Sequence, residues 1–220
     1  MAGGEQPPPD EISSGRLQAL SDSIFAFALT LLGSGLQVPE TAGDVTAAAL
    51  ARGLGAQWQS YAALVLSFVT VVIMWLNHHA IFGMVRESDA PFLVANGLVL
   101  LLVAVVPLPT DLVTEFLGTP AAPMAVAVYA GFFCAVTLAY NPLWLAASHR
   151  GRLLDPAAPP AYARTLTRNY LIGLPLYLAA TLMAFWNAYA GLGICLLLWV
   201  FWAMTARGRP RVKHSPAGTP

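Results

Sequence analysis

The sequence predicts an all-α integral membrane protein with six transmembrane helices. Only 10% of its 220 residues are charged and 57% are hydrophobic, whereas soluble domains carry about 25% charged residues. Runs of about 20 apolar residues, the length that crosses a bilayer as a helix, recur along the chain between charges, prolines and glycines. The basic residues are concentrated in alternate connections between these runs, which is typical of an even number of spans.

The boundaries of the spans follow from the charged and helix-breaking residues that flank each apolar run. The predicted spans cover residues 17–38, 58–77, 91–112, 124–146, 170–185 and 188–204. We expect residues 16–206 to form one transmembrane domain. Residues 1–15 carry no basic segment of a signal peptide and are expected to be a disordered cytoplasmic leader. Residues 207–220 are basic and proline-rich, as in a flexible cytoplasmic tail.

The distribution of basic residues also predicts the orientation of the chain. If the chain has six spans, most of its basic residues lie on the same side of the membrane: Arg16, Arg86, Arg150, Arg152, Arg164, Arg168, Arg207, Arg209, Arg211 and Lys213. Arg52 lies on the other side. Because loops rich in Lys and Arg stay in the cytoplasm, both termini are predicted to be cytoplasmic. The excess of Arg over Lys, with abundant Ala, Gly and Pro, indicates a GC-rich bacterial genome and therefore a plasma membrane.

The composition gives no support to nucleic-acid binding and none to a special role of the cysteines. The net charge is zero and no basic face with interleaved aromatic residues lies outside the spans, which argues against nucleic acid as a partner. The two cysteines, Cys134 and Cys195, fall inside the fourth and sixth spans, where we expect them to pack as small apolar residues.

The first span carries more polar residues than an ordinary membrane helix. At about 100° per residue, one stripe of this helix contains Leu20, Ile24, Phe27, Leu31, Ser34 and Val38, with Ser23 and Thr30 at its edge. Apolar rings separated by hydroxyls suit a narrow ion passage that closes by excluding water. One helix cannot enclose a passage, so this hypothesis requires a closed ring of identical subunits. In the alternative, the hydroxyls bond back to their own helix and the stripe faces lipid.

Asp22 points about 140° away from Phe27 on the same helical wheel and needs a separate explanation. A charge at membrane depth is costly and should meet partners from other helices. The predicted structural cluster consists of Arg16, Ser21, Asp22, His78, His79 and Asn96, which all fall near the cytoplasmic leaflet. A role of Asp22 in proton transfer is the alternative.

Several segments resemble one known family. RLQALSD, from Arg16, resembles the R-x-x-x-F-S-D signature of the lysosomal potassium channels, transmembrane protein 175 and its bacterial relatives. The likeness continues through SIFAFALTLLGSGLQVP, SYAALVLSFVTVVIMWLNHHAIF and DAPFLVANGLVLLLVAVVPLPTDLV, which are similar to the first three helices of that family. Beyond about Val113 the likeness rests on span count and polarity, so it covers roughly half of the chain.

The resemblance implies a single-repeat bacterial member that forms a homotetramer around a central pore lined by the first helix. The constriction of the family lies eleven positions after the signature arginine, which is Phe27 here, and its selectivity hydroxyl is Thr30, three positions further on. Leu31 and Ser34 would continue the lining outward, and Leu20 and Ile24 would line its inner part.

Three departures from the family pattern are visible. Leu20 replaces the signature Phe, and Phe27 replaces the usual Ile or Leu of the constriction. Gly33, Ser34 and Gly35 replace an aliphatic run.

The resulting hypothesis is passive, potassium-favouring cation conduction, with K⁺ and other monovalent cations as the permeant ions and no cofactor. No run of the TVGYG type is present, so no carbonyl filter is expected. Glu40, Asp44, Asp111 and Glu115 are predicted on the outer side, where they would either concentrate cations or be ordinary loop charges.

Two alternatives come from other classes of protein. A proton-coupled secondary transporter would use Asp22 and the nearby histidines. A membrane enzyme with a metal at His78, His79 and Asp22 is disfavoured, because adjacent histidines on a helix point about 100° apart. We therefore expect no catalytic residues and no metal site.

Overall fold

The computed structural model describes residues 14–39, 46–151 and 153–207, and the leader and tail predicted from the sequence lie largely outside them. The described residues form helices: α1 (Ser14–Ser34), α2 (Ala47–Ala56), α3 (Trp58–Phe82), α4 (Ala90–Val105), α5 (Pro107–Phe116), α6 (Ala122–Ser148), the short 3₁₀ helix η1 (His149–Gly151), α7 (Pro160–Trp186) and α8 (Ala188–Arg207). Six stretches are long and apolar enough to cross a membrane, with α4 and α5 together forming the third. The predicted all-α fold with six spans is confirmed.

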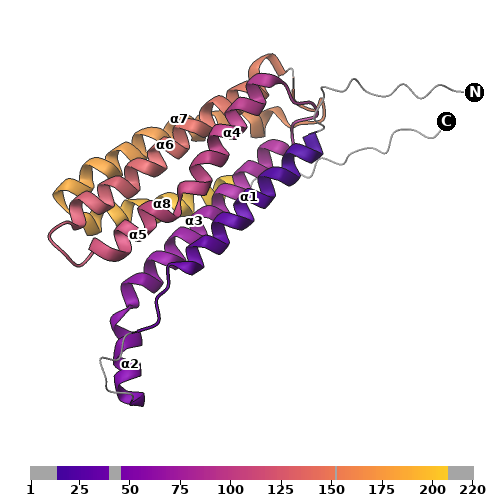
Figure 1. Cartoon of the computed structure of the whole chain (residues 1–220). Helices are drawn as coiled ribbons and strands as arrows, with labels where there is room; N and C mark the ends of the chain where they lie inside the picture. The colour runs from indigo at the N-terminus through magenta and orange to yellow at the C-terminus, as the bar shows by residue number, and fades with distance from the viewer. Residues whose placement is uncertain (1–13, 40–45, 152, 208–220) are drawn as a thin grey trace, which may run out of the picture.

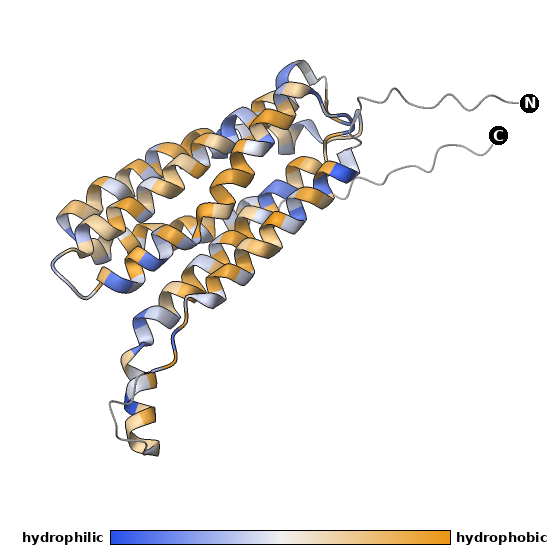
Figure 2. Cartoon of the chain, in the orientation of Figure 1, coloured by the Kyte–Doolittle hydropathy of each residue, from blue (hydrophilic) through white to orange (hydrophobic). Residues whose placement is uncertain are grey.

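The helices form an elongated bundle with α1 on one side of it (Figure 1). α1 packs mainly against α3 and α4, whereas α6 packs against α7 and α7 against α8 on the far side of the bundle. Apolar residues cover the outer surfaces of the helices as well as the interior (Figure 2), as expected of a chain whose surroundings are lipid. The protein is therefore a multi-pass membrane protein with α1 at one edge of the helix bundle.

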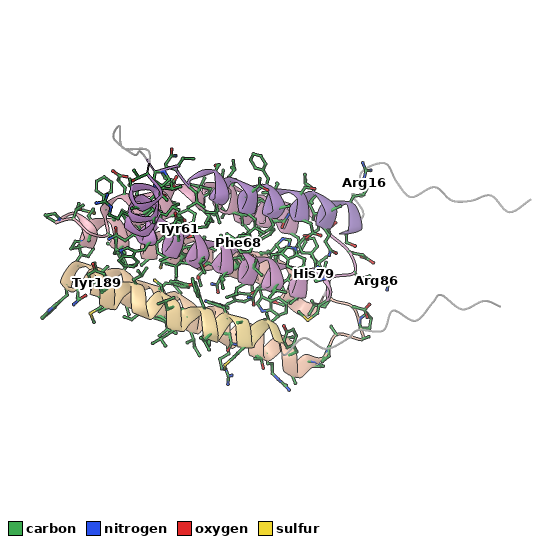
Figure 3. The ribbon with its side chains drawn as sticks, turned by 90° about the horizontal axis from the view of Figure 1, so that it is seen from below. Arg16, Tyr61, Phe68, His79, Arg86 and Tyr189 are labelled. Atoms are coloured by element: carbon green, nitrogen blue, oxygen red, sulfur yellow. The ribbon has the colours of Figure 1, made fainter. Side chains whose placement is uncertain are left out.

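Basic residues gather at one end of the bundle. Arg16 and Arg86 lie at the end where α1 begins, and Tyr61 and Tyr189 lie at the opposite end (Figure 3). The α6–α7 connection reaches the same end as Arg86, because the amide of Arg86 donates to the carbonyl of Leu153 at 2.9 Å. The distribution of charge along the bundle thus agrees with the six-span arrangement.

The third span differs from the continuous helix that the sequence predicted. Proline has no N–H with which to continue a helical ladder, and α4 ends at Val105, two residues before Pro107. Its last turn is tightened, since the amide of Val106 bonds to the carbonyl of Val103 at 3.2 Å. The break allows α5 to take its own direction and to contact α1.

Three other elements extend the sequence prediction. α2 follows the first span and projects beyond the bundle (Figure 1), and the hydroxyl of Thr46 caps it by accepting the amide of Ala49 at 3.2 Å. α3 continues five residues beyond the predicted end of the second span, to Phe82, and α7 begins ten residues before the predicted start of the fifth, at Pro160. These extensions bring His78 and His79 into helix α3 and Arg164 and Arg168 into helix α7.

Candidate functional site

One face of α1 is buried in the helix bundle and the opposite face is open. The buried residues are Leu17, Ser21, Phe25, Ala28 and Leu32. The open face contains Leu20, Ser23, Phe27, Thr30 and Ser34. Leu20 is 55% exposed and Phe27 60% exposed, which are high values for residues in the interior of a helix of a packed bundle.

The open face is rotated slightly from the stripe that the sequence predicted. Ser23 and Thr30 are exposed and lie within the face, not at its edge. Ile24 and Leu31 are half-buried, and Ile24 packs against the hydrophobic core. Val38 is 86% exposed but lies beyond the end of the helix. The stripe that remains open is therefore more polar than expected.

The hydroxyls of this face bond back to their own helix. Ser23 donates to the carbonyl of Ala19 at 2.9 Å, Thr30 to that of Ala26 at 3.0 Å, and Ser34 to that of Leu31 at 2.7 Å. Each hydroxyl hydrogen is thereby engaged, whereas the oxygen keeps acceptor capacity. Because these side chains are exposed, the face offers acceptors and no free hydroxyl hydrogens. Such a surface is suited to cations.

A carboxylate lies where this helix ends. A β-carbon at Gly35 would be 3.1 Å from Oδ1 of Asp111, which projects from α5. Asp111 and Glu115 are both exposed. The two other predicted outer acids, Glu40 and Asp44, lie outside the described residues.

A buried hydrogen-bond network connects α1, α3 and α4 near the other end of α1. Oδ1 of Asn96 is 2.7 Å from Nε2 of His78, and Nδ2 of Asn96 donates to the hydroxyl of Ser21 at 3.2 Å. All three side chains are almost completely buried. The imidazole of His78 is packed between the rings of Phe25 and Phe82, with centroid distances of 5.3 and 4.4 Å. The network therefore fixes the inner half of α1 against its neighbours.

Asp22 and His79 lie beside this network in separate hydrogen bonds. The indole N–H of Trp75 donates to Oδ1 of Asp22 at 2.8 Å. Nδ1 of His79 is 2.8 Å from Nε2 of Gln18, and the rings of His79 and Trp75 stack at 5.5 Å. Trp75 and Gln18 were not anticipated from the sequence. The signal for them was helical spacing, since Trp75 precedes His79, and Gln18 precedes Asp22, by four residues.

Arg16 is placed apart from the rest of the predicted cluster. Its side chain is exposed and lies at the end of α1 (Figure 3), where it makes no ion pair with Asp22 among the described residues. The indole N–H of Trp75 donates to Asp22 instead, and a neutral donor stabilises the half-buried carboxylate without burying a second charge.

Comparison with known proteins identifies the family. A family model described as endosomal/lysosomal potassium channel TMEM175 matches residues 16–107. A protein of Chamaesiphon minutus named as a potassium channel is 38% identical over 196 residues, which cover 89% of this chain and 96% of the relative. The chain belongs to the TMEM175 family. A second protein named as a potassium channel, from Streptomyces collinus, is 40% identical over 80% of this chain and 84% of its own length.

The TMEM175 fold is also found in a solved structure. The crystal structure of a lysosomal potassium-selective channel TMEM175 homolog from Chamaesiphon minutus superposes with a TM-score of 0.77 at 37% identity, and covers 88% of this chain and 97% of that one. The family resemblance is thus confirmed, and it extends well beyond Val113, where the sequence motifs ended. The relatives carry the names of ion channels and not of enzymes.

The part matched by the TMEM175 family model is the part that builds the candidate site. It begins at Arg16 and ends at Pro107, where the third span breaks. It therefore contains the open face of α1 and the network of Ser21, His78 and Asn96. No group of three or more His, Cys, Asp and Glu side chains that could hold a metal ion occurs in the described residues.

Proposed function

We propose that four copies of this chain form a potassium-favouring cation channel whose pore is lined by the open face of α1. The observation that carries the proposal is the row of three acceptor hydroxyls, Ser23, Thr30 and Ser34, beside the exposed Phe27 on a membrane helix. Hydroxyls that bond back to their own helix also fit a lipid-facing helix, so it is the channel names of the relatives that favour a pore at this face. The names of the relatives support potassium as the ion.

The position of α1 supports a ring-shaped oligomer. Since α1 lies at one side of the bundle (Figure 1), its open face is available for a symmetry axis, while α6, α7 and α8 lie on the far side. A cyclic ring places the same face of every subunit around one axis. The buried network of Ser21, His78 and Asn96 then sets the rotation of α1 and so decides which residues face the axis.

The chemistry of the face accounts for modest selectivity. Phe27 supplies the apolar constriction, where an ion must shed part of its water, and Leu20 and Ile24 lie on the inner side of it. K⁺ gives up water at lower cost than Na⁺ because its charge is spread over a larger radius. The oxygens of Thr30 and Ser34 replace part of the lost hydration, and Leu31 lies at the edge of this outer segment. Conduction is passive and needs no carbonyl filter.

The distribution of charged residues supports an assignment of the outer and cytoplasmic ends of the pore. Asp111 and Glu115 lie at the outer mouth and raise the local concentration of cations. The end that bears Arg16 and Arg86 faces the cytoplasm of a bacterial cell, with both termini on that side. The protein resides in the plasma membrane.

The experiment is a potassium flux assay on the full chain in liposomes. Native mass spectrometry first establishes a tetramer, and an outward K⁺ gradient is then applied with a proton carrier present to balance charge. We expect K⁺ efflux that exceeds Na⁺ efflux. A folded tetramer without K⁺ flux at any pH from 5 to 8 would exclude the channel proposal.

Proton-coupled transport through Asp22 and the histidines is the alternative, favoured by the half-buried carboxylate of Asp22. A TMEM175 protein of cattle, 27% identical over 80% of this chain and 38% of its own length, is named as a proton channel, and this name supports proton permeation and not coupled transport. The two mechanisms differ in coupling. A channel conducts K⁺ without a pH gradient, whereas a coupled transporter drives K⁺ against its gradient when a pH gradient is imposed. The substitution Asp22→Asn is expected to abolish this uphill K⁺ transport.

A further inference from the structure

A stripe along the outside of α7 combines two arginines with a row of leucines. Arg164 and Arg168 are exposed in the first turns, and Leu171, Leu178 and Leu182 follow with exposures of 64%, 51% and 63%. The spacings of four, three, seven and four residues keep all five side chains on one helical face. Helix α7 itself lies on the side of the bundle away from α1 (Figure 1).

A groove between α6 and α7 runs beside the two arginines. It has a volume of about 500 Å³ and is lined by Trp144, Ser148, Leu154, Arg164, Arg168 and Leu171, among others. Arg168 also lines a second groove of about 550 Å³ on the other side of α7, next to α8. Arg168 thus lines two grooves, one on each side of α7.

Neither arginine has an acidic partner among the described residues. The ion pair found in that part of the chain joins Arg86 and Glu87, at 3.9 Å, on another connection. The hydroxyl of Ser148 makes no hydrogen bond to a described residue and faces the same groove. Two guanidinium groups one turn apart, with a free hydroxyl nearby, suit a phosphate, whose oxygens accept from several donors at once.

We propose that Arg164 and Arg168 bind the phosphate of an anionic phospholipid whose acyl chain lies along Leu171, Leu178 and Leu182. The α6–α7 connection is tied to Arg86 by the Arg86 to Leu153 hydrogen bond, so the two arginines lie near the basic end of the bundle, which we assign to the membrane interface. From Leu171 to Leu182 the stripe is about 16 Å long, at 1.5 Å per residue. This length matches one leaflet of a hydrocarbon core about 30 Å thick.

The place of the arginines at the end of an apolar stripe favours a lipid over a soluble anion. Leu171, Leu178 and Leu182 face acyl chains in either case, and a headgroup anchored to those chains is held beside the arginines, whereas a soluble phosphate must be bound from dilute solution. A zwitterionic lipid would place its own ammonium group beside the unpaired guanidiniums, which costs part of the attraction. An anionic headgroup neutralises them, and basic grooves between membrane helices on the cytoplasmic side are suited to such lipids.

Native mass spectrometry of the purified full chain with added phosphatidylglycerol or phosphatidylcholine tests the proposal. The wild type is expected to retain phosphatidylglycerol preferentially, and Arg164→Gln/Arg168→Gln to lose about tenfold in its affinity. The matched control is Arg16→Gln/Arg86→Gln, which removes two charges at the same end of the bundle and should keep the affinity within about twofold. Arg164→Lys/Arg168→Lys should recover part of the binding.

Several outcomes would overturn the lipid site. Equal retention of the two lipids, or an equal loss in both double variants, would reduce it to general surface charge. Stabilisation by millimolar inorganic phosphate equal to that by phosphatidylglycerol would make it a site for soluble anions. Thermal unfolding in phosphatidylcholine, expected to be the same in all variants, establishes that each is folded. None of these measurements depends on ion conduction.

Discussion

The carboxylate of Asp111 lies against Gly35, the first residue after α1: a β-carbon there would be 3.1 Å from Oδ1. The two residues are far apart in the sequence and come together because Pro107 breaks the third span and redirects α5. An acidic side chain is thereby placed at the outer end of the helix that we propose to line the pore.

Asp111→Asn is expected to lower K⁺ conductance about two- to threefold at 10 mM salt, because the carboxylate raises the local cation concentration at the mouth. The effect should vanish near 1 M salt, where screening shortens the Debye length to about 3 Å. Single-channel recording at both salt concentrations measures this. Asp155→Asn, on the α6–α7 connection at the other end, is the control and should leave inward conductance unchanged.

The apolar length of the spans made the fold predictable, since each run of about 20 residues between charges has little alternative to a membrane helix. The open face of α1 was predictable because helical periodicity separates it from the face of Leu17, Phe25 and Leu32. Periodicity cannot tell which neighbour a face meets. The break before Pro107 was missed because a proline is tolerated in membrane helices and need not end one.

The polar cluster was predictable in its members more than in its bonds. Asn96, His78 and Ser21 fall at the same depth by topology alone, and the structure joins them. The partner of Asp22 was not predicted, because the sequence pattern pointed to Arg16 and the histidines and does not tell which side chain of α3 meets Asp22. Tertiary packing chose the indole of Trp75.

Ser21→Ala is expected to destabilise the folded protein by about 1 kcal/mol, because it leaves the buried Nδ2 of Asn96 without its acceptor. Thermal or denaturant unfolding in detergent measures the change. Ser23→Ala is a matched control on the same helix, since Ser23 also bonds to the carbonyl four residues earlier but is exposed. Equal losses in the two variants would show that the interhelical bond contributes nothing.

Gly173→Ala is expected to destabilise the bundle by about 1 to 3 kcal/mol through overpacking. A β-carbon there would overlap the indole of Trp202 and lie 3.3 Å from Cγ2 of Thr137. Gly193→Ala is the control, because a β-carbon at that position would meet no neighbouring atom within 4 Å, and alanine favours a helix over glycine by about 1 kcal/mol. Unfolding midpoints should therefore move in opposite directions. A neutral Gly173→Ala would mean that Trp202 repacks freely.

Phe27→Ala is expected to raise unitary K⁺ conductance at least about twofold and to weaken closure, because a hydrophobic constriction closes a pore by excluding water. Single-channel recording in planar bilayers measures both quantities. Phe185→Ala is the control: this phenylalanine is 56% exposed, similar to Phe27 at 60%, but it lies on α7, on the far side of the bundle. If the two substitutions have the same effect, the constriction lies elsewhere.

Thr30→Val is expected to lower the ratio of K⁺ to Na⁺ permeability about twofold or more, because it removes an acceptor oxygen and keeps the shape of the side chain. In the subunit Thr30 donates only to the carbonyl of Ala26, so the substitution breaks no contact between helices. Thr30→Ser retains the oxygen and should retain the ratio. Reversal potentials under bi-ionic conditions give the ratio directly. A ratio that is the same in the Val and Ser variants would remove Thr30 from the selectivity mechanism and leave dehydration at Phe27 as its source.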